Sequence, residues 1–276
     1  LLPRQLLHEG TCSTDNFFQP EIQSTDEKYI RLTHNTDYIN RLYNLDIHGH
    51  PARKIGFPLS EKLVERERTI TNGTIQACEF ALQYGLAMNI AGGTHHAYSD
   101  RGEAFCMIND QAIGANYLLN NKKAQQILVV DLDVHQGNGT AEIFRNDDRV
   151  FTFSMHGKNN YPFKKEKSDL DIALPDKTSD EIYLNTLKKQ LPQLIESVKP
   201  DFVFYLSGVD ILATDKLGKL GCSVEGCKER DRYVLSLLHQ YKLPVEVSMG
   251  GGYSKDIKVI IDAHANTYRM AQDIYF

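Results

Sequence analysis

The chain has 276 residues, of which 41% are hydrophobic and 24% are charged, and its formal net charge is −5. These are ordinary values for a globular protein with a sizeable core, and the acidic balance argues against an electrostatic nucleic-acid-binding surface. No apolar run reaches the length of a membrane span. The five cysteines form no Cys-x-x-Cys pair, so we expect free thiols in a cytoplasmic protein, or a nuclear one if the source is eukaryotic. The chain starts at Leu1 rather than at Met, which leaves open what precedes it.

Short apolar runs alternate with helical patterns along the chain, which is typical of an α/β fold with a mainly parallel central sheet. Strands are predicted at Ala87–Ala91, Ile127–Asp133, Val150–Ser154, Phe202–Ser207 and Val245–Met249. Most are continuous apolar runs, as expected for strands that are covered on both faces. We therefore predict a single-domain, three-layer α/β/α structure over residues 1–276, of which residues 1–31 are the part that the pattern defines least.

Two helices are well marked between these strands. Thr69–Tyr84 carries apolar residues at three- and four-residue spacing, and Gly85 follows it as a C-cap. Asp180–Val198 repeats the pattern after an acidic first turn. Pro192 within that segment predicts either a kink or two shorter helices. No internal repeat, low-complexity segment or long linker divides the chain.

Polar motifs follow the ends of the predicted strands. They occupy residues 92–96 (Gly-Gly-Thr-His-His), 131–139 (Asp-Leu-Asp-Val-His-Gln-Gly-Asn-Gly), 154–156, 207–210 and 249–253. Open parallel sheets place their ligands at the carboxyl ends of their strands. We therefore expect these five segments to form one active site at that edge of the sheet.

Asp133, His135 and Asp210 are the candidate metal ligands. Residues i and i+2 of a strand point the same way, so Asp133 and His135 could reach one ion, and Asp210 supplies a third ligand from another strand. Two carboxylates and one imidazole are compatible with zinc, iron or manganese. Three protein ligands leave a position for water, whose pKa the ion would lower. An Asp-x-His triplet alone is weak evidence, so the prediction depends on the neighbouring motifs.

The other motifs carry candidate acid–base groups. His95 and His96 follow a Gly-Gly turn, and one ring could move a proton while the other stays cationic and stabilises negative charge. Asp131 could hold a histidine tautomer, and Asn138 could do the same or be only a turn residue. The hydroxyl of Tyr253, after three glycines, could donate to an oxyanion. Six further histidines share no ligand spacing and are interpreted as surface or core residues, namely His8, His34, His48, His50, His239 and His264.

These motifs, in this order, resemble the zinc-dependent histone deacetylase family, which has the arginase/deacetylase α/β fold. The similarity runs from about Leu32 to the C-terminus. The segments His-Gln-Gly-Asn-Gly, Gly-Gly-Thr-His-His and Asp-Arg-Gly before Phe105-Cys106 look most like class IV members, the group of human histone deacetylase 11 and its bacterial relatives.

The resemblance implies that Asp133, His135 and Asp210 hold zinc, with iron(II) as an alternative in vivo. It also implies a structural potassium ion, bound largely by backbone carbonyls near Asp131, Asp133, His135, Ser154 and Met155.

The same resemblance implies roles for the surrounding side chains. A His95–Asp131 pair would be mainly electrostatic, and His96, paired with Asn138, would act as general base and then as general acid. Tyr253 would polarise the scissile amide carbonyl. The substrate-binding positions would form an acyl-lysine tunnel, with aromatic walls, a rim residue and small residues at its inner part: Phe105, Tyr161, Leu217, Ala104, Gly251 and Gly252.

Three positions distinguish the chain from relatives. Many members have Asp at Asn138, so His96 should be less basic here, although class II and class IV members share the Asn. Ala104 stands where Gly is usual and would narrow the inner end of the tunnel. Arginases need an aspartate two residues after the histidine of Asp-x-His, and Gly137 at that position disfavours a two-metal hydrolase.

The sequence therefore favours metal-dependent hydrolysis of the amide bond of N6-acyl-lysine, acetyl or longer fatty acyl, in proteins or peptides. Two alternatives remain: a deacetylase of acetylpolyamines or another small amide, and a catalytically weak module that binds acyl-lysine. Direct nucleic-acid binding is not expected, and the oligomeric state is left open.

Overall fold

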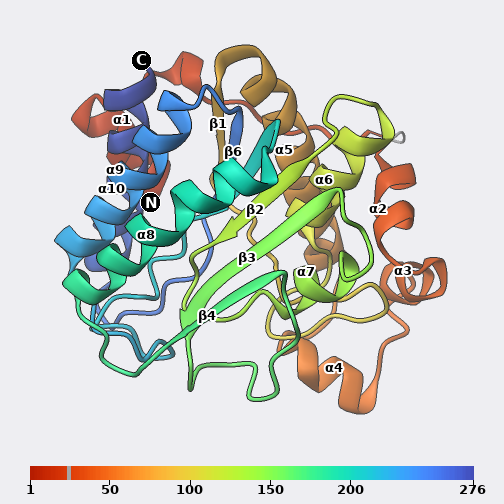
Figure 1. Cartoon of the computed structure of the whole chain (residues 1–276). Helices are drawn as coiled ribbons and strands as arrows, with labels where there is room; N and C mark the ends of the chain where they lie inside the picture. Colours follow the sequence, from red (N-terminus) through yellow and green to blue (C-terminus); the bar gives the residue numbers. More distant parts are fainter. Residues whose placement is uncertain (24–25) are drawn as a thin grey trace.

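The computed structural model of the chain (Figure 1) describes residues 1–23 and 26–276. Residues 24–25, which fall in the amino-terminal part of the predicted domain, lie outside the described residues. Six strands form one sheet: β1 (Leu86–Asn89), β2 (Ile127–Asp131), β3 (Val150–Gly157), β4 (Leu170–Leu174), β5 (Phe202–Leu206) and β6 (Val245–Ser248). All neighbouring strands are parallel. The predicted α/β fold with a mainly parallel sheet is confirmed.

Helices cover both faces of the sheet. They are α1 (Leu2–Glu9), α2 (Glu27–Thr33), α3 (Thr36–Tyr43), α4 (Gly49–Ile55), α5 (Glu61–Tyr84), α6 (Asp110–Asn120), α7 (Asn138–Ile143), α8 (Asp180–Val198), α9 (Val224–Gln240) and α10 (Ile257–Tyr275), with a short 3-10 helix at Thr14–Asn16. Residues of α8, α9 and α10 pack on one face of the sheet, and residues of α5 and α6 pack on the other (Figure 1). The three-layer architecture is therefore as predicted, and none of the described helices combines the length and apolar character that a bilayer span requires.

The side chains of β2 show why the strands read as continuous apolar runs. Leu128 and Val130 belong to the core on the α8–α10 side, whereas Ile127 and Val129 belong to the core on the α5–α6 side. All four side chains are buried. Because successive strand residues face opposite sides, a strand covered on both faces needs apolar residues at every position.

The strand order positions the site. The sheet runs β1-β6-β5-β2-β3-β4, so the chain proceeds outward from β2 through β3 to β4 and then returns to start again at β5 on the other side of β2. Such a reversal separates the loops that follow the two central strands and leaves a crevice at their carboxyl ends, where α/β proteins bind ligands. The segments after β2 and β5 are those that carry Asp133 and Asp210.

The strand boundaries differ from the predicted ones. β2 ends at Asp131 rather than at Asp133, because the chain leaves the ladder there and the Val134 amide donates to the Asp210 carboxylate instead, at 2.9 Å. The edge strand β4 was not predicted. It pairs only with β3 and is partly exposed, so it lacks the continuous apolar run of the buried strands.

Both predicted helices exist, with one changed boundary. α5 begins at Glu61 rather than at Thr69, because the Ser60 side chain accepts a hydrogen bond from the Leu63 amide and caps the helix there. Gly85 is its C-cap as predicted, with a left-handed φ of 88°.

α8 is one continuous helix, so the alternative of two shorter helices around Pro192 is wrong. Proline has no amide hydrogen for the carbonyl four residues earlier, which belongs to Lys188. The Tyr233 hydroxyl donates to that carbonyl at 3.3 Å, which gives it a partner from the neighbouring helix α9.

Candidate active site

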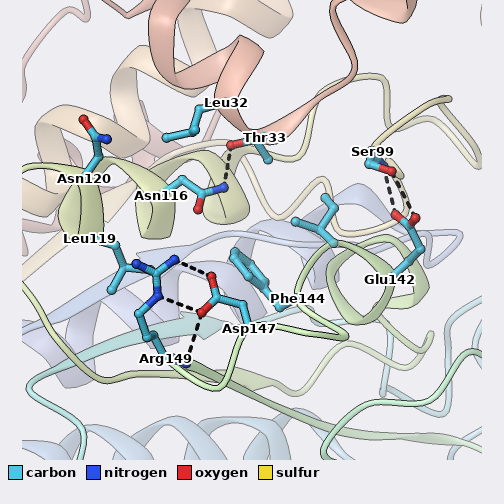
Figure 2. Close-up of a pocket in the computed structure, with 11 residues that line it drawn as sticks. Leu32, Thr33, Ser99, Asn116, Leu119, Asn120, Glu142, Phe144, Asp147 and Arg149 are labelled. Atoms are coloured by element: carbon cyan, nitrogen blue, oxygen red, sulfur yellow. Dashed lines mark hydrogen bonds and ion pairs between the residues drawn. The ribbon is translucent and has the colours of Figure 1, made fainter.

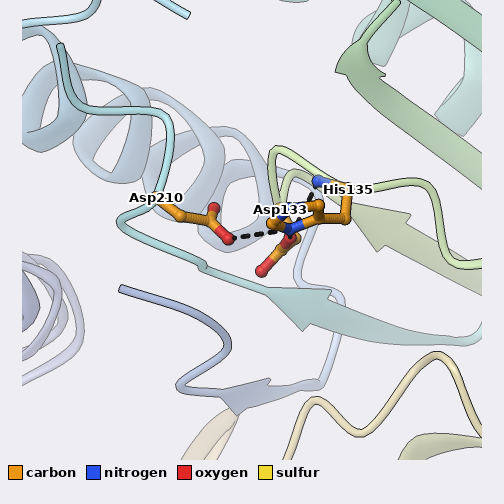
Figure 3. A group of neighbouring side chains, drawn as sticks. All are labelled: Asp133, His135 and Asp210. Carbon is orange, nitrogen blue, oxygen red and sulfur yellow. Dashed lines mark hydrogen bonds and ion pairs between the residues drawn. The ribbon is translucent and has the colours of Figure 1, made fainter. Parts of the chain in front are cut away.

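Asp133, His135 and Asp210 converge in the crevice beyond β2 and β5 (Figure 3). Their candidate ligand atoms all lie within 4.8 Å of one another. His135 Nδ1 is 3.0 Å from Asp133 Oδ1 and 3.2 Å from Asp210 Oδ2. No other group of three or more histidine, cysteine or acidic side chains is gathered in this way within residues 1–23 and 26–276. The structure thus brings the predicted ligand set together.

The route to this convergence is not the predicted one. Asp133 and His135 do not share a strand face, because both lie in a bend after the end of β2. The His135 amide donates to Asp133 Oδ1 at 2.9 Å, which folds the loop back on itself and directs the imidazole to the carboxylate. A local hydrogen bond, and not strand alternation, therefore sets the spacing of these two ligands.

Glycines make room for the two carboxylates. A Cβ added to Gly208 would lie 2.5 Å from Asp133 Oδ2, and one added to Gly251 would overlap Asp210 Oδ2. The Gly251 amide also donates to Asp133 Oδ2 at 3.0 Å. The glycine-rich segment before Tyr253 therefore packs against the ligands, which larger residues would displace.

Gly137 and Gly252 fill two further positions for steric reasons. A Cβ at Gly137 would overlap Asp131 Oδ2, so the position that holds an additional aspartate in arginases has no room for a side chain here. Gly252, predicted as a substrate-binding residue, is not among the residues that line the pocket. A Cβ there would meet Val209 and Ile260, so Gly252 packs against the protein interior.

The residues present fit a divalent metal ion. Burial opposes a charge on His135, but Asp133 and Asp210 raise its pKa to about 10, so a metal ion must displace a proton from this ring. Burial and the nearby Asp133 carboxylate raise the pKa of Asp210. Two buried carboxylates side by side need a cation, and two oxygen ligands with one nitrogen suit zinc, iron(II) or manganese.

His95 and His96 are adjacent and equally buried, yet they have different partners. His95 Nδ1 lies 2.7 Å from Asp131 Oδ2, and His96 Nδ1 lies 2.6 Å from Asn138 Oδ1. Burial opposes a charge on His95, but the Asp131 carboxylate outweighs it and raises the pKa of His95 to about 9. Burial and the charges of His95 and His135 lower the pKa of His96 well below its usual value. At neutral pH the first ring is cationic and the second is neutral.

The Asn138 amide fixes the tautomer of His96. Asn138 Nδ2 donates to the Tyr98 hydroxyl at 3.0 Å, which leaves Oδ1 to accept from His96. Nδ1 of His96 therefore carries the proton, and Nε2 keeps a free lone pair. Asn138 begins α7, so the interpretation as a turn residue is wrong and its contact with a histidine is as predicted.

A pocket of about 950 Å³ opens over these groups. Of the residues predicted to form an acyl-lysine tunnel, all but Gly252 line it, namely Phe105, Tyr161, Leu217, Ala104 and Gly251. The Tyr161 ring stands edge-on to His96 at 5.0 Å between centroids, and the Phe105 ring lies 6.4 Å from that of Tyr253. Burial and the charges of Asp133 and Asp210 raise the pKa of Tyr253 to about 12, so its hydroxyl is protonated and can donate.

The backbone of the pocket wall is strained at two residues. Ala104 and Phe105 have φ angles of 46° and 70°, in the left-handed region that side chains with a Cβ seldom adopt. Their amides donate to the carbonyls of Lys54 and Ile55 at 2.8 and 2.7 Å, which holds the segment against α4. The strain lies at the pocket, where non-standard backbone is often functional.

Sequence reasoning missed two contributors to this site. Glu103 accepts a hydrogen bond from the Tyr161 hydroxyl at 2.6 Å and also pairs with Lys54 and Arg101, which fixes the pocket wall. Its place between Asp-Arg-Gly and Phe105 was a signal that could have identified it.

Arg230 is the second missed residue, and no motif marked it. Its fully buried guanidinium donates to the carbonyls of Gly208 at 2.6 Å, Ser207 at 3.2 Å and Leu132 at 3.4 Å. The Leu132 carbonyl directly precedes Asp133, and the other two carbonyls lie two and three residues before Asp210. Arg230 therefore connects the two ligand-bearing loops by hydrogen bonds to their backbone carbonyls.

The other predicted positions lie outside the pocket. Ser154 pairs in register with Asp131 on neighbouring strands, and Met155 is fully buried on β3.

Of the six histidines interpreted as surface or core residues, His34 and His264 are buried and the others are exposed. All five cysteines are free, as expected.

A second, smaller pocket of about 380 Å³ lies between α2, α6 and α7 (Figure 2). Several of its polar side chains are paired with one another: Asn116 donates to Thr33 at 2.8 Å, and Arg149 binds Asp147. None of the predicted catalytic or metal-binding residues lines it.

Comparison with known proteins places this site in a family. A model of the histone deacetylase domain matches residues 4–268, so the match begins nearer the amino terminus than the motifs predicted. An uncharacterized protein of Picosynechococcus sp. is 42% identical over 275 residues, which are 100% of this chain and 91% of that protein. Histone deacetylase 2 of Arabidopsis thaliana is 31% identical over 77% of this chain, which spans only 56% of that protein. Acetoin utilization protein AcuC of Staphylococcus aureus (strain COL) is 30% identical over 90% of this chain and 68% of that protein.

Solved structures agree with the sequence comparisons. The crystal structure of an HDAC homologue from Aquifex aeolicus superimposes with a TM-score of 0.81 at 26% identity, covering 98% of this chain and 75% of that one. A structure of an HDAC homologue complexed with SAHA gives the same TM-score of 0.81 at 27% identity. With the domain match spanning nearly the whole sequence, this chain belongs to the histone deacetylase family.

Proposed function

We propose that this chain hydrolyses the amide bond of N6-acyl-lysine in proteins or peptides in a metal-dependent reaction. Its family supports a deacetylase hydrolase, and the class IV motifs support a member of that group. The observation that carries the proposal is the contrast between His95, cationic beside Asp131, and His96, neutral beside Asn138, next to a three-ligand metal site at the base of a pocket. A neutral base can take a proton from the attacking water, and a fixed cation can stabilise the negative charge that develops during amide hydrolysis.

Asp133, His135 and Asp210 would hold the metal ion, for which zinc is the first choice and iron(II) the second. When bound, the ion would lower the pKa of a water molecule and draw electron density from the acyl carbonyl. A structural potassium ion near Asp131 and Ser154 is a further part of the proposal and is supported by the family resemblance.

The side chains of the protein move the protons. Nε2 of His96 accepts a proton from the attacking water, while Nδ1–H of the same ring keeps its hydrogen bond to Asn138 Oδ1. The Tyr253 hydroxyl donates to the oxyanion that forms from the carbonyl, and the cationic His95 offsets the developing negative charge. His96 then returns its proton to the departing lysine amine.

The proposal is tested with lysine peptides that differ only in acyl length, from acetyl to long fatty acyl, incubated with metal-stripped protein reloaded with zinc or with iron(II). Tyr253→Phe should lower kcat by about 10²–10³, as the loss of other oxyanion donors does. Tyr241→Phe is the matched control, because that tyrosine is exposed and its hydroxyl donates to Glu196 on the surface. Equal turnover by the Tyr253→Phe protein, or no hydrolysis of any peptide by the zinc-loaded protein, would refute the proposal.

A further inference from the structure

The mouth of the large pocket combines exposed hydrophobic side chains with basic ones. Phe57, Phe163 and Leu217 line the pocket and are 39%, 88% and 46% exposed. They come from three separate segments: the loop after α4, the loop between β3 and β4, and the loop before α9. Basic residues from α4 and from the latter two loops also reach the pocket lining, namely Arg53, Lys164 and Lys219.

These three cations have no charged partner. Arg53, Lys164 and Lys219 are exposed, and within the described part of the chain their side chains make no ion pair or hydrogen bond. The other basic residues in the lining differ in this respect. They are bound to carboxylates, in the pairs Lys54–Glu103, Arg101–Glu103 and Arg66–Glu67.

The acidic residues in the lining do not offset the free cations. Glu103 is held by Lys54 and Arg101, and Glu166 is held by Arg145. The remaining two acids in the lining, Asp133 and Asp210, are the metal ligands at its base. The mouth therefore carries an excess of positive charge, although the chain as a whole has a net charge of −5.

We propose that this mouth selects acyl-lysines that lie in acidic protein segments, with Arg53, Lys164 and Lys219 as the residues that determine the preference. This inference rests on the proposed acyl-lysine hydrolysis. The cations come from α4 and from two loops that line the same pocket, so an acidic segment bound there would be attracted to them. The neighbouring hydrophobic side chains add contact area for a peptide backbone. An acetylated polyamine, which is itself cationic, is disfavoured by the same charges.

The test uses three peptides with the same central acyl-lysine and with flanks of Asp and Glu, of Ser and Gln, or of Lys and Arg. The zinc-loaded protein should have a kcat/KM about 10-fold higher for the acidic peptide than for the basic one at low ionic strength. Salt should reduce that ratio, because exposed charges are screened beyond about 8 Å at 0.15 M. Acetylspermidine should be a poorer substrate than the acidic peptide.

A triple variant tests the three named residues. Arg53→Gln, Lys164→Gln and Lys219→Gln together should bring the ratio of acidic to basic peptide to within about 2-fold. The matched control removes three exposed lysines far from the mouth, Lys189→Gln in α8 with Lys199→Gln and Lys242→Gln at the amino ends of β5 and β6. It removes as much charge and should keep the wild-type ratio.

Peptide binding is measured in parallel by fluorescence anisotropy, so that the two proposals fail separately. If none of the peptides is hydrolysed, the proposed function is refuted. The measured affinities would then still show whether the mouth prefers the acidic peptide. If the acidic peptide is hydrolysed and bound no better than the basic one, the proposed role of the mouth is wrong, while the proposed amide hydrolysis is unaffected. A ratio that survives in the triple variant, or falls equally in the control, would overturn the assignment of the three residues.

Discussion

Replacing Arg230 by methionine should be among the most destabilising single substitutions in this protein. The side chain is fully buried, and its guanidinium makes an ion pair with Asp231 at 2.8 Å besides its bonds to three carbonyls. Burial opposes the charge, but Asp231 raises the pKa of Arg230 well above its usual value, so the group is charged at every accessible pH. Methionine fills a similar volume and removes the charge, which leaves Asp231 buried without its counter-ion. Breaking a buried pair in this way costs about 3–5 kcal/mol.

That loss is large against a total stability of about 5–15 kcal/mol, and it corresponds to a fall in Tm of roughly 10 °C for a domain of this size. Urea unfolding followed by circular dichroism measures it directly. Arg232→Met is the matched control, because Arg232 lies on the same helix and pairs with Glu229 at the surface. Exposed pairs contribute about 1 kcal/mol or less, so the control should unfold near the wild-type midpoint.

The same substitution should weaken metal binding. Arg230 holds the backbone within three residues of Asp133 and of Asp210, and loss of such outer contacts commonly lowers metal affinity by about 10–100-fold. Zinc competition with a chelator, at a temperature where the variant is folded, tests this effect apart from stability. A loss of stability below about 1 kcal/mol in Arg230→Met, or a zinc affinity equal to that of Arg232→Met, would refute the reasoning.

Three further changes test other parts of the structure. Asn138→Asp would place a carboxylate against His96, raise the pKa of His96 and move the acidic limb of the kcat/KM profile up by about 1–3 pH units; an unchanged profile would contradict the pairing. Ala104→Gly should raise the free energy of unfolding by up to about 1 kcal/mol, because glycine adopts the left-handed φ of this position without strain. The control Ala52→Gly, within α4, should instead lower the free energy of unfolding by about 0.5–1 kcal/mol. Thermal unfolding shows whether the two variants shift Tm in opposite directions. Arg269 lowers the pKa of Glu9 to about 2, so this contact between α10 and α1 stabilises the fold above pH 4.5 and is lost as pH falls towards 2. The difference in free energy of unfolding between wild type and Glu9→Gln should therefore shrink as pH falls over that range. A difference that stays constant would count against the pairing.

Residues of the sheet and of the site were predictable for the same physical reason. A strand covered on both faces is apolar along most of its length, as residues 127–130 of β2 are, so a polar residue such as Asp131 marks its end. Parallel strands bring all their carboxyl ends to one edge of the sheet. Residues that are distant in sequence, such as His95 and Asp210, can therefore be predicted to meet there even when the order of the strands is unknown. The candidate metal ligands and the His95–His96 pair were predicted in this way, whereas the residues of the acyl-lysine tunnel came from the family resemblance.

What escaped prediction depends on partners that have no pattern of their own. β4 lies at the sheet edge, where one neighbouring strand and partial exposure replace the continuous apolar signal. Arg230 reads as an ordinary basic residue within the charged helix α9, and only the fold shows that it faces three carbonyls from two distant loops. The bend that pairs His135 with Asp133 likewise follows from hydrogen bonds formed after the strand has ended.

The two adjacent histidines show how the site separates the two acid–base roles. His95 and His96 are each 5% exposed, so burial alone would lower the pKa of both rings by similar amounts. They differ in the partner of Nδ1, which is a carboxylate for His95 and an amide for His96. The charge on Asp131 therefore produces the difference, and it acts twice, because the His95 cation that it stabilises in turn helps to keep His96 neutral. Asn138 holds the His96 ring at the same distance without adding a charge, which leaves that ring free to accept a proton.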